Sequence, residues 1–302
     1  MKKNSRFVIT GGAGFIGSNL VDHLVRIGHN VIVLDNFVSG KKENLSHHKK
    51  NVKIIKVDIS KSKNLEKLFK GADYVFHLAG LAEIIPSIKN PGKYFINNVV
   101  GTLNVLEAAK KVRIKKLIYA ASSSCYGTPK KFPTSEIDKI DTQHPYALTK
   151  FLGEELVMMY ASIFNMPNIS FRFFNVYGPR LNASGQYGAV FGNFLKQKKT
   201  RKPLTIVGNG KQTRDFIHVD DLIKAFVKVS KSKFVNKIYN LGSGKETSIN
   251  RIARLFGGKK IFIPKRPSEP HRSLAKISKI KKDINWKPII SVEEGVKRLL
   301  KN

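Results

Sequence analysis

The chain has 302 residues, of which 41% are hydrophobic, and a formal net charge of +34. This length is sufficient for a large core, and we expect one large domain with a smaller lobe. No apolar run is as long as a membrane span, and Met1–Asn4 does not begin a signal sequence. The lone cysteine, Cys125, excludes an intrachain disulfide framework and a multi-cysteine metal site. These features predict a soluble, cytoplasmic protein.

The positive charge comes largely from lysine pairs that are scattered along the chain, such as Lys110-Lys111 and Lys281-Lys282. A nucleic-acid-binding protein gathers its basic residues in a tail or in a patch with aromatic residues. We therefore favour a lysine-rich solvated surface, and nucleic-acid binding stays a remote alternative. Part of the charge would suit a substrate that carries a diphosphate.

The apolar run Phe7–Thr10 predicts a buried parallel strand that leads directly into the glycine-rich segment 11–17. A helix is expected to follow, because apolar residues recur at helical spacing at Leu20, Val21, Leu24 and Val25. Gly11, Gly14 and Gly17 fall three residues apart. A strand, a glycine turn and a helix N-terminus form a phosphate cradle, since the first amides of the helix point outward. The segment predicts a nucleotide site.

The second predicted strand, Val31–Leu34, ends in Asp35. An acidic residue at this distance from the glycine turn binds the ribose hydroxyls of NAD. Its carboxylate would repel the 2′-phosphate of NADP, so NAD is favoured. Lys41 and Lys42 lie near enough to leave NADP open.

Further strands are predicted at 52–57, 74–78 and 117–121, with helices around 65–69 and 97–112. Strands that alternate with helices predict an α/β fold with a doubly wound parallel sheet. Cofactors bind outside the carboxyl ends of such strands. That edge is where the sequence places Asp35, Asp58, Ala79-Gly80 and the serines after Ala121. His77 ends a strand without metal-spaced partners, so we expect a structural role and no metal.

A serine cluster, Ser122-Ser123-Ser124, follows the strand at 117–121. Tyr146 and Lys150 come later, four residues apart on a predicted helix that follows Pro145. This spacing places both side chains on one face of the helix. The pair is informative because it follows a nucleotide turn and a serine cluster at a strand end.

In this combination the sequence resembles the extended short-chain dehydrogenase/reductase superfamily, and within it the NAD-dependent sugar-nucleotide epimerases and dehydratases. The segments that carry the resemblance are 10–17, 121–127, Tyr146-x-x-x-Lys150, 172–180 and 214–221. The resemblance implies a Rossmann NAD-binding domain at 1–174, joined by about 211–242. It also implies an interleaved substrate-binding lobe at 175–302, and a homodimer.

The resemblance further implies the residues of the site. Those implied to contact NAD are Gly11, Gly14, Phe15, Ile16, Gly17, Asp35, Asn36, Asp58, Ile59, Leu78, Ala79, Gly80, Asn97, Tyr146, Lys150 and Phe174. Those implied to contact a UDP-sugar are Ser122, Ser123, Asn175, Ala189, Val190, Arg214, Arg266 and Ser273. Arg214 and Arg266 are interpreted as a diphosphate clamp, with surface ion pairs as the alternative.

The expected chemistry begins with Tyr146 as the general base. A free tyrosine hydroxyl has a pKa near ~10, so the base must be activated. Lys150 and a positive nicotinamide ring would both lower the pKa of Tyr146. Ser122 would hold the sugar hydroxyl while Tyr146 removes its proton.

The serine cluster also bears on the reaction type. In the 4,6-dehydratases of the superfamily an Asp-Glu pair follows the Ser/Thr, and the decarboxylases usually carry a Glu in this stretch. Here the matching residues are Ser123 and Ser124. A missing general acid or base costs roughly 10²–10⁴-fold in rate. A UDP-hexose 4-epimerase is therefore favoured. A dehydratase, decarboxylase or reductase of the same family stays the alternative, and a catalytically idle member a remote one.

The choice of sugar is expected to rest on Ser273. The segment 266–275 resembles the one that lines the far side of the sugar pocket in the 4-epimerases. Glucose-restricted members have a tyrosine at the position of Ser273, whereas serine leaves room for an N-acetyl group. The alternative is an ordinary loop residue in a register shifted by one or two.

Overall fold

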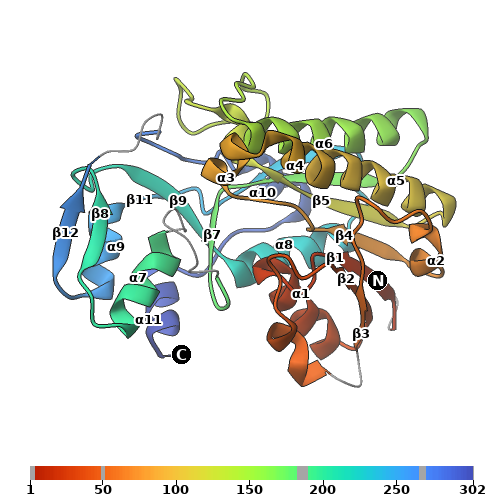
Figure 1. Cartoon of the computed structure of the whole chain (residues 1–302). Helices are drawn as coiled ribbons and strands as arrows, with labels where there is room; N and C mark the ends of the chain where they lie inside the picture. The colour runs from red at the N-terminus through yellow and green to blue at the C-terminus, as the bar shows by residue number, and fades with distance from the viewer. Residues whose placement is uncertain (1–3, 49–51, 182–189, 265–269, 302) are drawn as a thin grey trace.

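The computed structural model describes residues 4–48, 52–181, 190–264 and 270–301. Its main sheet has seven strands in the order β10-β6-β5-β4-β1-β2-β3, and every pairing is parallel (Figure 1). The strands are β1 (Arg6–Thr10), β2 (Asn30–Asp35), β3 (Val52–Lys56), β4 (Tyr74–His77), β5 (Lys116–Ser122), β6 (Asn168–Phe173) and β10 (Lys237–Leu241). The chain order reverses between β1 and β4, which is the usual ligand-binding position in such sheets. The predicted α/β doubly wound sheet is confirmed.

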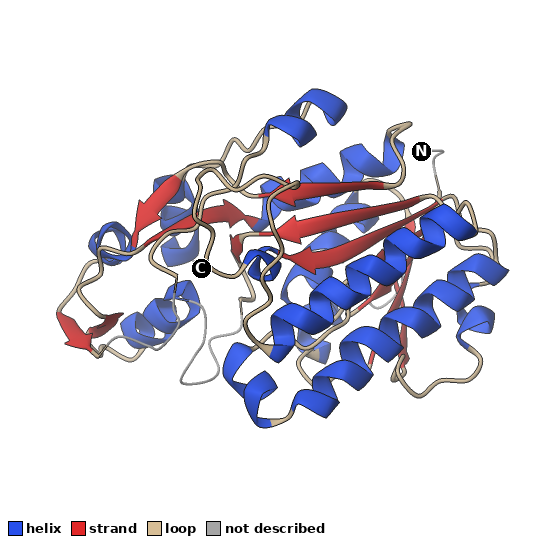
Figure 2. Cartoon of the chain, turned by 90° about the horizontal axis from the view of Figure 1, so that it is seen from above, coloured by secondary structure: helices blue, strands red, loops and turns tan. Residues whose placement is uncertain are grey.

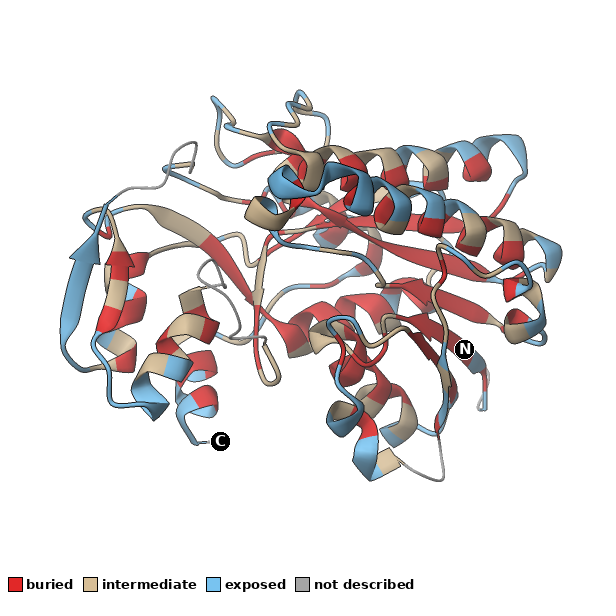
Figure 3. Ribbon diagram, in the orientation of Figure 1, coloured by how far each residue is buried: buried red, intermediate tan, exposed pale blue. Residues whose placement is uncertain are grey.

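Helices cover both faces of this sheet (Figure 2). One face is covered by α2 (Leu65–Phe69), α5 (Gly101–Lys111) and α6 (Pro145–Ile163), and the other by α1 (Phe15–Arg26), α8 (Val219–Lys231) and α10 (Ser278–Ile284). Each helix buries an apolar stripe, as α8 does with Leu222, Phe226 and Val229. Except for the edge strand β3, the strands between the two layers are buried along most of their length (Figure 3). This explains why they are continuous apolar runs rather than alternating ones.

A second, smaller lobe has its own core. It contains a three-stranded sheet in the order β11-β9-β7 and a two-stranded sheet of β12 and β8. Its elements are β7 (Asn175–Tyr177), α7 (Val190–Lys199), β8 (Leu204–Val207), β9 (Thr213–His218), β11 (Glu246–Ser248), α9 (Ile249–Phe256), β12 (Lys260–Ile263) and α11 (Val292–Lys301). Phe191, Phe194, Ile206, Ile252 and Phe256 are buried together at its centre.

The chain passes between the two lobes several times. Within the segment 211–242, β9 pairs with β7 and β11 in the small lobe, whereas α8 and β10 belong to the large one. The segment 275–286 also returns to the large lobe, since Ile277, Ile280 and Trp286 join its core. The lobes are thus interleaved rather than joined by one linker.

Shorter helices complete the chain near the carboxyl edge of the sheet. These are the 3₁₀ helices η1 (Lys42–His48) and η3 (Ser123–Tyr126), the helices α3 (Ile84–Lys89) and α4 (Pro91–Phe95), and the π-helix η2 (Ile96–Val100). The π-helix lies between α4 and α5 without a break, so residues 91–111 form one helical segment with a local change of register. No helix in the described part of the chain combines the length and apolarity needed to cross a bilayer.

Candidate functional site

The glycine turn between β1 and α1 has no space for a side chain at Gly11, Gly12 or Gly17. Gly11 has a φ of +70°, and a Cβ atom there would lie 2.7 Å from the backbone N of Ala79. A Cβ atom on Gly17 would lie 2.7 Å from the Cα of Gly12. Helix α1 begins at Phe15, and no side chain caps its N-terminus at Gly14. The turn and the first amides of α1 therefore fit a pyrophosphate, which needs close backbone approach and unprotected N–H groups.

Asp35 ends β2 beside this turn and is buried. Its Oδ2 accepts a hydrogen bond from Ala13 N at 2.9 Å, and its Oδ1 accepts one from Phe37 N at 2.8 Å. Burial raises the pKa of Asp35 and these two amides oppose the shift. The carboxylate thus fixes the glycine turn, and each oxygen keeps an acceptor site for a ribose hydroxyl.

The neighbouring predicted NAD contacts make local bonds at the ends of β2 and β3. The side chain of Asn36 accepts a hydrogen bond from Val38 N at 3.1 Å. Asp58 follows β3, and its Oδ1 accepts hydrogen bonds from Ser60 N at 3.0 Å and Ser60 Oγ at 2.7 Å. Ile59 is buried in the core beneath α5. All three lie at the carboxyl edge of the sheet, as the strand pattern predicted.

His77 is held behind the turn rather than in it. Its Nδ1 lies 2.7 Å from Thr10 Oγ1, and its Nε2 lies 2.9 Å from Thr102 Oγ1. Burial lowers the pKa of His77 to about 3, so the ring is neutral. Thr10 Oγ1 also accepts a hydrogen bond from Ala79 N at 3.3 Å, next to Leu78 and Gly80. His77 therefore has a structural role in joining β1, β4 and α5.

The loop after β4 is fixed by Asn98, which the sequence analysis did not select. Asn98 Oδ1 accepts a hydrogen bond from Leu81 N at 2.8 Å, and Nδ2 donates to Leu81 O and Thr149 Oγ1 at 3.0 Å each. Asn97, which was predicted to contact NAD, donates back to Lys93 O at 2.8 Å. The sequence shows two adjacent asparagines. Asn98 is the buried one, four residues from buried Tyr94 and Thr102, whereas Asn97 is half-buried.

The serine cluster forms a tight turn at the end of β5. Ser122 is buried, and its Oγ accepts hydrogen bonds from Ser124 N at 3.2 Å and Ser124 Oγ at 2.8 Å. A hydroxyl has two acceptor sites and one donor. Ser122 therefore has its own proton left to donate.

That proton meets Tyr146, at the start of α6. Tyr146 N donates to Ser87 Oγ at 3.1 Å, and the ring stacks on His144 with centroids 5.9 Å apart. Burial raises the pKa of Tyr146, and a side-chain hydrogen bond to Ser122 opposes the shift. We expected Lys150 to lower this pKa. In the protein alone burial outweighs every favourable contact, because a phenolate loses its hydration there.

Lys150 lies one turn further along α6 and is also buried. Its Nζ lies 4.4 Å from the centroid of the Tyr119 ring, and a Cβ atom on Gly80 would lie 3.7 Å from it. Burial lowers the pKa of Lys150 to about 7, against an opposing effect of Glu154. Among the residues that the structure describes, none accepts a hydrogen bond from this ammonium. The lysine faces the same loop that Asn98 holds.

A buried polar network lies below this pair and was also missed. Arg172 Nη2 and Glu154 Oε1 form an ion pair at 2.6 Å, and Arg172 Nη1 donates to Tyr126 Oη at 2.8 Å. Tyr126 Oη donates in turn to Asn240 Oδ1 at 2.7 Å. Tyr126 and Arg172 belong to the motifs that carried the family resemblance, and this membership is the sequence feature that could have identified the network. The network joins α6, the serine turn, β6 and β10.

The remaining predicted residues come from both lobes. Phe174, predicted to contact NAD, donates its N–H to Leu241 O at 3.0 Å, and the predicted substrate residue Asn175 donates through Nδ2 to Asp215 O at 3.3 Å. Arg214 lies on β9 opposite Thr247, and its Nη1 donates to Thr213 O at 2.8 Å. Val190 is the first residue of α7. Ala189 and Arg266 lie outside the described residues.

Ser273 lies in a segment with a fixed register. Arg272 forms an ion pair with Glu246 at 2.6 Å, and three residues later Ala275 forms a parallel bridge with Thr134. Buried Asp215 accepts hydrogen bonds from Ala275 N at 3.0 Å and Gly244 N at 2.9 Å. Thr134 belongs to the connection that follows the serine turn. The segment that carries Ser273 is therefore bonded to β9 through Asp215. It also pairs with the loop that follows Ser122–Ser124, through the bridge between Ala275 and Thr134.

Comparison with known proteins identifies relatives that span the whole chain. The model of the NAD-dependent epimerase/dehydratase family matches residues 7–242. A putative UDP-glucose 4-epimerase of Methanocaldococcus jannaschii is 36% identical over 97% of this chain and 96% of its own length. UDP-glucuronic acid decarboxylase 1 of Arabidopsis thaliana is also 36% identical, over 99% of this chain and 70% of its own length. Identity alone does not separate the two reaction types.

A solved structure matches equally well. The UDP-N-acetylglucosamine 4-epimerase of Methanobrevibacter ruminantium, in complex with UDP-N-acetylmuramic acid, superposes with a TM-score of 0.93 at 34% identity. The match covers 99% of both chains. The arrangement of both lobes is thus shared with a protein that binds an N-acetylated UDP-sugar.

Proposed function

The chain belongs to the NAD-dependent epimerase/dehydratase family, and we propose that it is a UDP-sugar 4-epimerase. The observation that carries this proposal is the serine turn. Ser123 and Ser124 stand where a dehydratase or a decarboxylase has its acidic residues, and both donors of Ser124 are directed to Ser122 Oγ. The turn supports oxidation of a hydroxyl and offers no carboxylate for an elimination.

The site fits NAD on its own geometry. The glycine turn has no room for a Cβ atom at Gly11, Gly12 or Gly17, and Asp35 is fixed beside it. Asp35 favours NAD over NADP because a carboxylate repels a 2′-phosphate. When bound, NAD supplies the group that takes a hydride from the sugar and later returns it.

The chain's own residues handle the proton. Ser122 donates to Tyr146, and this hydrogen bond favours the phenolate. Tyr146 takes the proton from the sugar C4 hydroxyl as C4 is oxidised, and Ser122 holds the same oxygen. After the keto sugar rotates in the pocket, the opposite face of C4 would be turned toward the bound cofactor for return of the hydride, and Tyr146 returns the proton to the C4 oxygen. Lys150 positions the nicotinamide ribose and adds positive charge beside Tyr146 in its protonated form.

We further propose that N-acetylated UDP-sugars are substrates. Ser273 has a small side chain and its segment is anchored on both sides, by Arg272 and by Ala275. The anchoring supports a fixed position for Ser273 in the sugar pocket. Val190 and Asn175, with Ala189, Arg214 and Arg266, are assigned to the nucleotide and its diphosphate.

The decisive assay uses purified protein with UDP-glucose, UDP-N-acetylglucosamine and their galacto epimers, with products resolved by chromatography. We expect interconversion of the acetylated pair without net NADH accumulation, and loss of that activity in Ser273→Tyr with UDP-glucose turnover retained. Ser273→Ala is the matched control, which should keep both activities. Steady reduction of added NAD would identify a dehydrogenase instead and refute the proposal.

A decarboxylase is the second candidate, because a plant decarboxylase is as similar as the archaeal epimerase. UDP-glucuronic acid distinguishes the two. A decarboxylase releases CO₂ from it, whereas we expect no release because the serine turn has no carboxylic acid. Sustained CO₂ release at a rate comparable to epimerisation would favour the decarboxylase.

We also propose that the protein is a homodimer that pairs through the helical face of η2, α5 and α6. This face exposes apolar side chains: Phe95, Ile96, Val100, Leu103, Met159 and Ile163. The helices lie next to each other along the upper edge of Figure 1. Large exposed apolar patches mark interaction sites, and a two-fold axis lets one patch pair with itself.

Sedimentation of variants tests the dimer. We expect Val100→Glu to give a monomer, because a carboxylate would be buried in the contact. Ile289→Glu is the control, since Ile289 is 66% exposed elsewhere on the surface. A wild type that sediments as a monomer would refute this proposal and leave the enzymatic one intact.

A further inference from the structure

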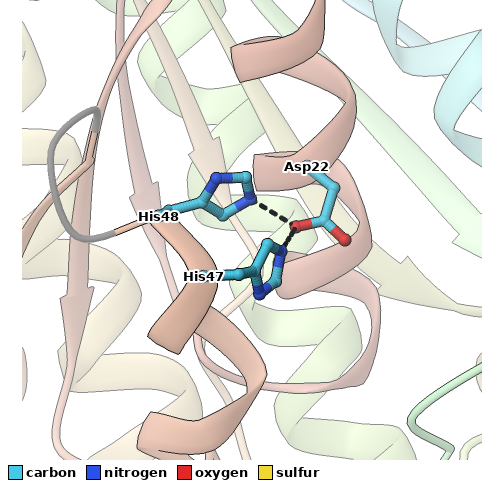
Figure 4. Close-up of side chains that lie close together, drawn as sticks. All are labelled: Asp22, His47 and His48. Atoms are coloured by element: carbon cyan, nitrogen blue, oxygen red, sulfur yellow. Dashed lines mark hydrogen bonds and ion pairs between the residues drawn. The ribbon is translucent and has the colours of Figure 1, made fainter.

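Three side chains that no predicted site includes meet between α1 and η1. Asp22 projects from α1, and the adjacent residues His47 and His48 end η1 (Figure 4). His47 Nε2 lies 2.9 Å from Asp22 Oδ1, and His48 Nε2 lies 2.6 Å from the same oxygen. The two rings are close, with centroids 4.0 Å apart.

Two nitrogens that converge on one carboxylate oxygen form a metal-ligand set. One ligand atom from each of the three residues lies within 4.8 Å of the others. A tetrahedral ion with bonds of about 2.0–2.1 Å holds its ligands roughly 3.3 Å apart, so small side-chain rotations would admit one. Two imidazoles and a carboxylate select Zn²⁺ and similar transition metals, whereas Mg²⁺ prefers oxygen ligands.

The surroundings support the ligand set. Arg180 Nη2 pairs with Asp22 Oδ2 and with Asn19 Oδ1 at 2.9 Å, so Oδ1 stays directed at the histidines. Metal-bound carboxylates are commonly hydrogen-bonded on their other oxygen, and this fixes their orientation. The guanidinium of Arg180 also repels a cation, and this lowers the affinity of the site. The three protein ligands leave the fourth position of a tetrahedral ion to water.

We propose that Asp22, His47 and His48 bind one Zn²⁺-type ion as a structural site. The ion would replace the two N–H···O contacts with bonds to the same three atoms, and each imidazole would then carry its proton on Nδ1. It would fasten η1 to α1. The same helix η1 carries Asn44, whose Nδ2 donates to Ala13 O at 2.8 Å in the glycine turn. Metal binding would therefore stabilise the segment beside Asp35 without touching the reacting sugar.

The test uses full-length protein freed of any histidine tag and treated with a chelating resin. Titration with ZnCl₂ by calorimetry should give one ion per chain, and MgCl₂ should not compete. Co²⁺ should bind with the strong visible absorption of tetrahedral nitrogen ligation. Thermal unfolding should shift upward with Zn²⁺, because binding to the folded state alone stabilises it.

Variants separate this site from adventitious binding. His48→Ala and His47→Ala should each weaken Zn²⁺ binding at least 10-fold and remove the Co²⁺ spectrum. His47 is exposed, so His47→Ala keeps the fold. His23→Ala is the matched control on the same helix, since His23 faces Arg26 instead. Absence of Zn²⁺ binding, or binding unchanged in both cluster variants, would overturn the proposal and leave a hydrogen-bonded clamp.

Discussion

The two ends of β5 each have a buried lysine, and the protein treats them in opposite ways. Lys116 begins the strand, and its Nζ donates to the carbonyls of Val229, Ser232 and Phe234 at 2.8–2.9 Å. Lys150 lies beside the carboxyl end of the strand, over the Tyr119 ring, and the described residues offer its ammonium no hydrogen-bond acceptor. All three donors are used at the first end, and none at the second.

This difference shows how one sheet separates stability from function. A buried ammonium is costly unless it is hydrogen-bonded. At the amino end the cost is offset, so Lys116 fastens α8 and its following turn to the sheet. Burial lowers the pKa of both lysines, that of Lys116 to about 8 and that of Lys150 to about 7, but at the carboxyl end the ammonium donors are left for a ligand. Groups with such shifted pKa values are typical of functional sites.

The largest expected effect lies at the carboxyl end. Tyr146→Phe should lower kcat by about 10²–10⁴-fold, because it removes the proton acceptor and keeps the ring. NAD content and the unfolding temperature should stay near those of the wild type. Tyr160→Phe, two turns or more further along α6, is the control and should leave kcat unchanged. A Tyr146→Phe enzyme with more than a tenth of the wild-type rate would place the base elsewhere.

The next effect lies at the amino end and concerns stability. Lys116→Met should lower the free energy of unfolding by about 2–4 kcal/mol, since three buried carbonyls lose their donor. Urea unfolding measures the loss, and kcat below the unfolding transition should not change. If Lys116→Met were as stable as the wild type, the hydrogen bonds of Lys116 would not stabilise the fold. The distinction between a stabilising Lys116 and a functional Lys150 would then be wrong.

A smaller effect is the pH dependence that Lys150 adds to the stability of the protein. The folded-state pKa of Lys150 is lowered to about 7 from 10.5. Between these values the unfolded chain binds the proton that the folded chain releases, so the stability of the ligand-free protein rises with pH. Below pH 7 Lys150 is protonated in both the folded and the unfolded chain, so it adds no further pH dependence to the stability there. We expect the wild type to gain about 1–2 kcal/mol between pH 7.5 and 9 relative to Lys150→Met.

Urea unfolding of both proteins at several pH values gives this difference directly. The comparison with Lys150→Met cancels the general effect of the high net charge, which changes little with one substitution. Equal slopes for the two proteins would mean that Lys150 is protonated in the folded state throughout the range.

The smallest effect concerns the loop beside Lys150. Asn98→Ala should weaken NAD binding about 5–10-fold, near 1 kcal/mol, because the loop after β4 loses two hydrogen bonds and α6 loses one. Asn97→Ala is the matched control, with an expected change below about twofold, a few tenths of a kcal/mol. Calorimetry on protein stripped of nucleotide measures both. If Asn97→Ala weakened NAD binding more than Asn98→Ala, Asn97 would be the residue that contacts NAD, as the sequence predicted.

The sequence by itself determined the layout of the sheet and the edge at which the site lies. Buried parallel strands are apolar runs, and glycine turns and helix periodicity are local patterns. These patterns place Gly11, Asp35, the serine cluster and Tyr146 correctly in relation to the sheet. The predicted strands agree with the observed ones to within a residue or two at their ends.

The tertiary structure decided which side chains meet. Packing places Asn98, rather than Asn97, against the loop after β4. The hydrogen-bond acceptors of Lys116 come from residues more than a hundred positions away, and Asp22 meets His47 and His48 across two elements. Burial sets the pKa of Lys150 and Tyr146 against the direction that their neighbours alone would give. Desolvation depends on everything that packs around a group, and this sum exists once the chain is folded.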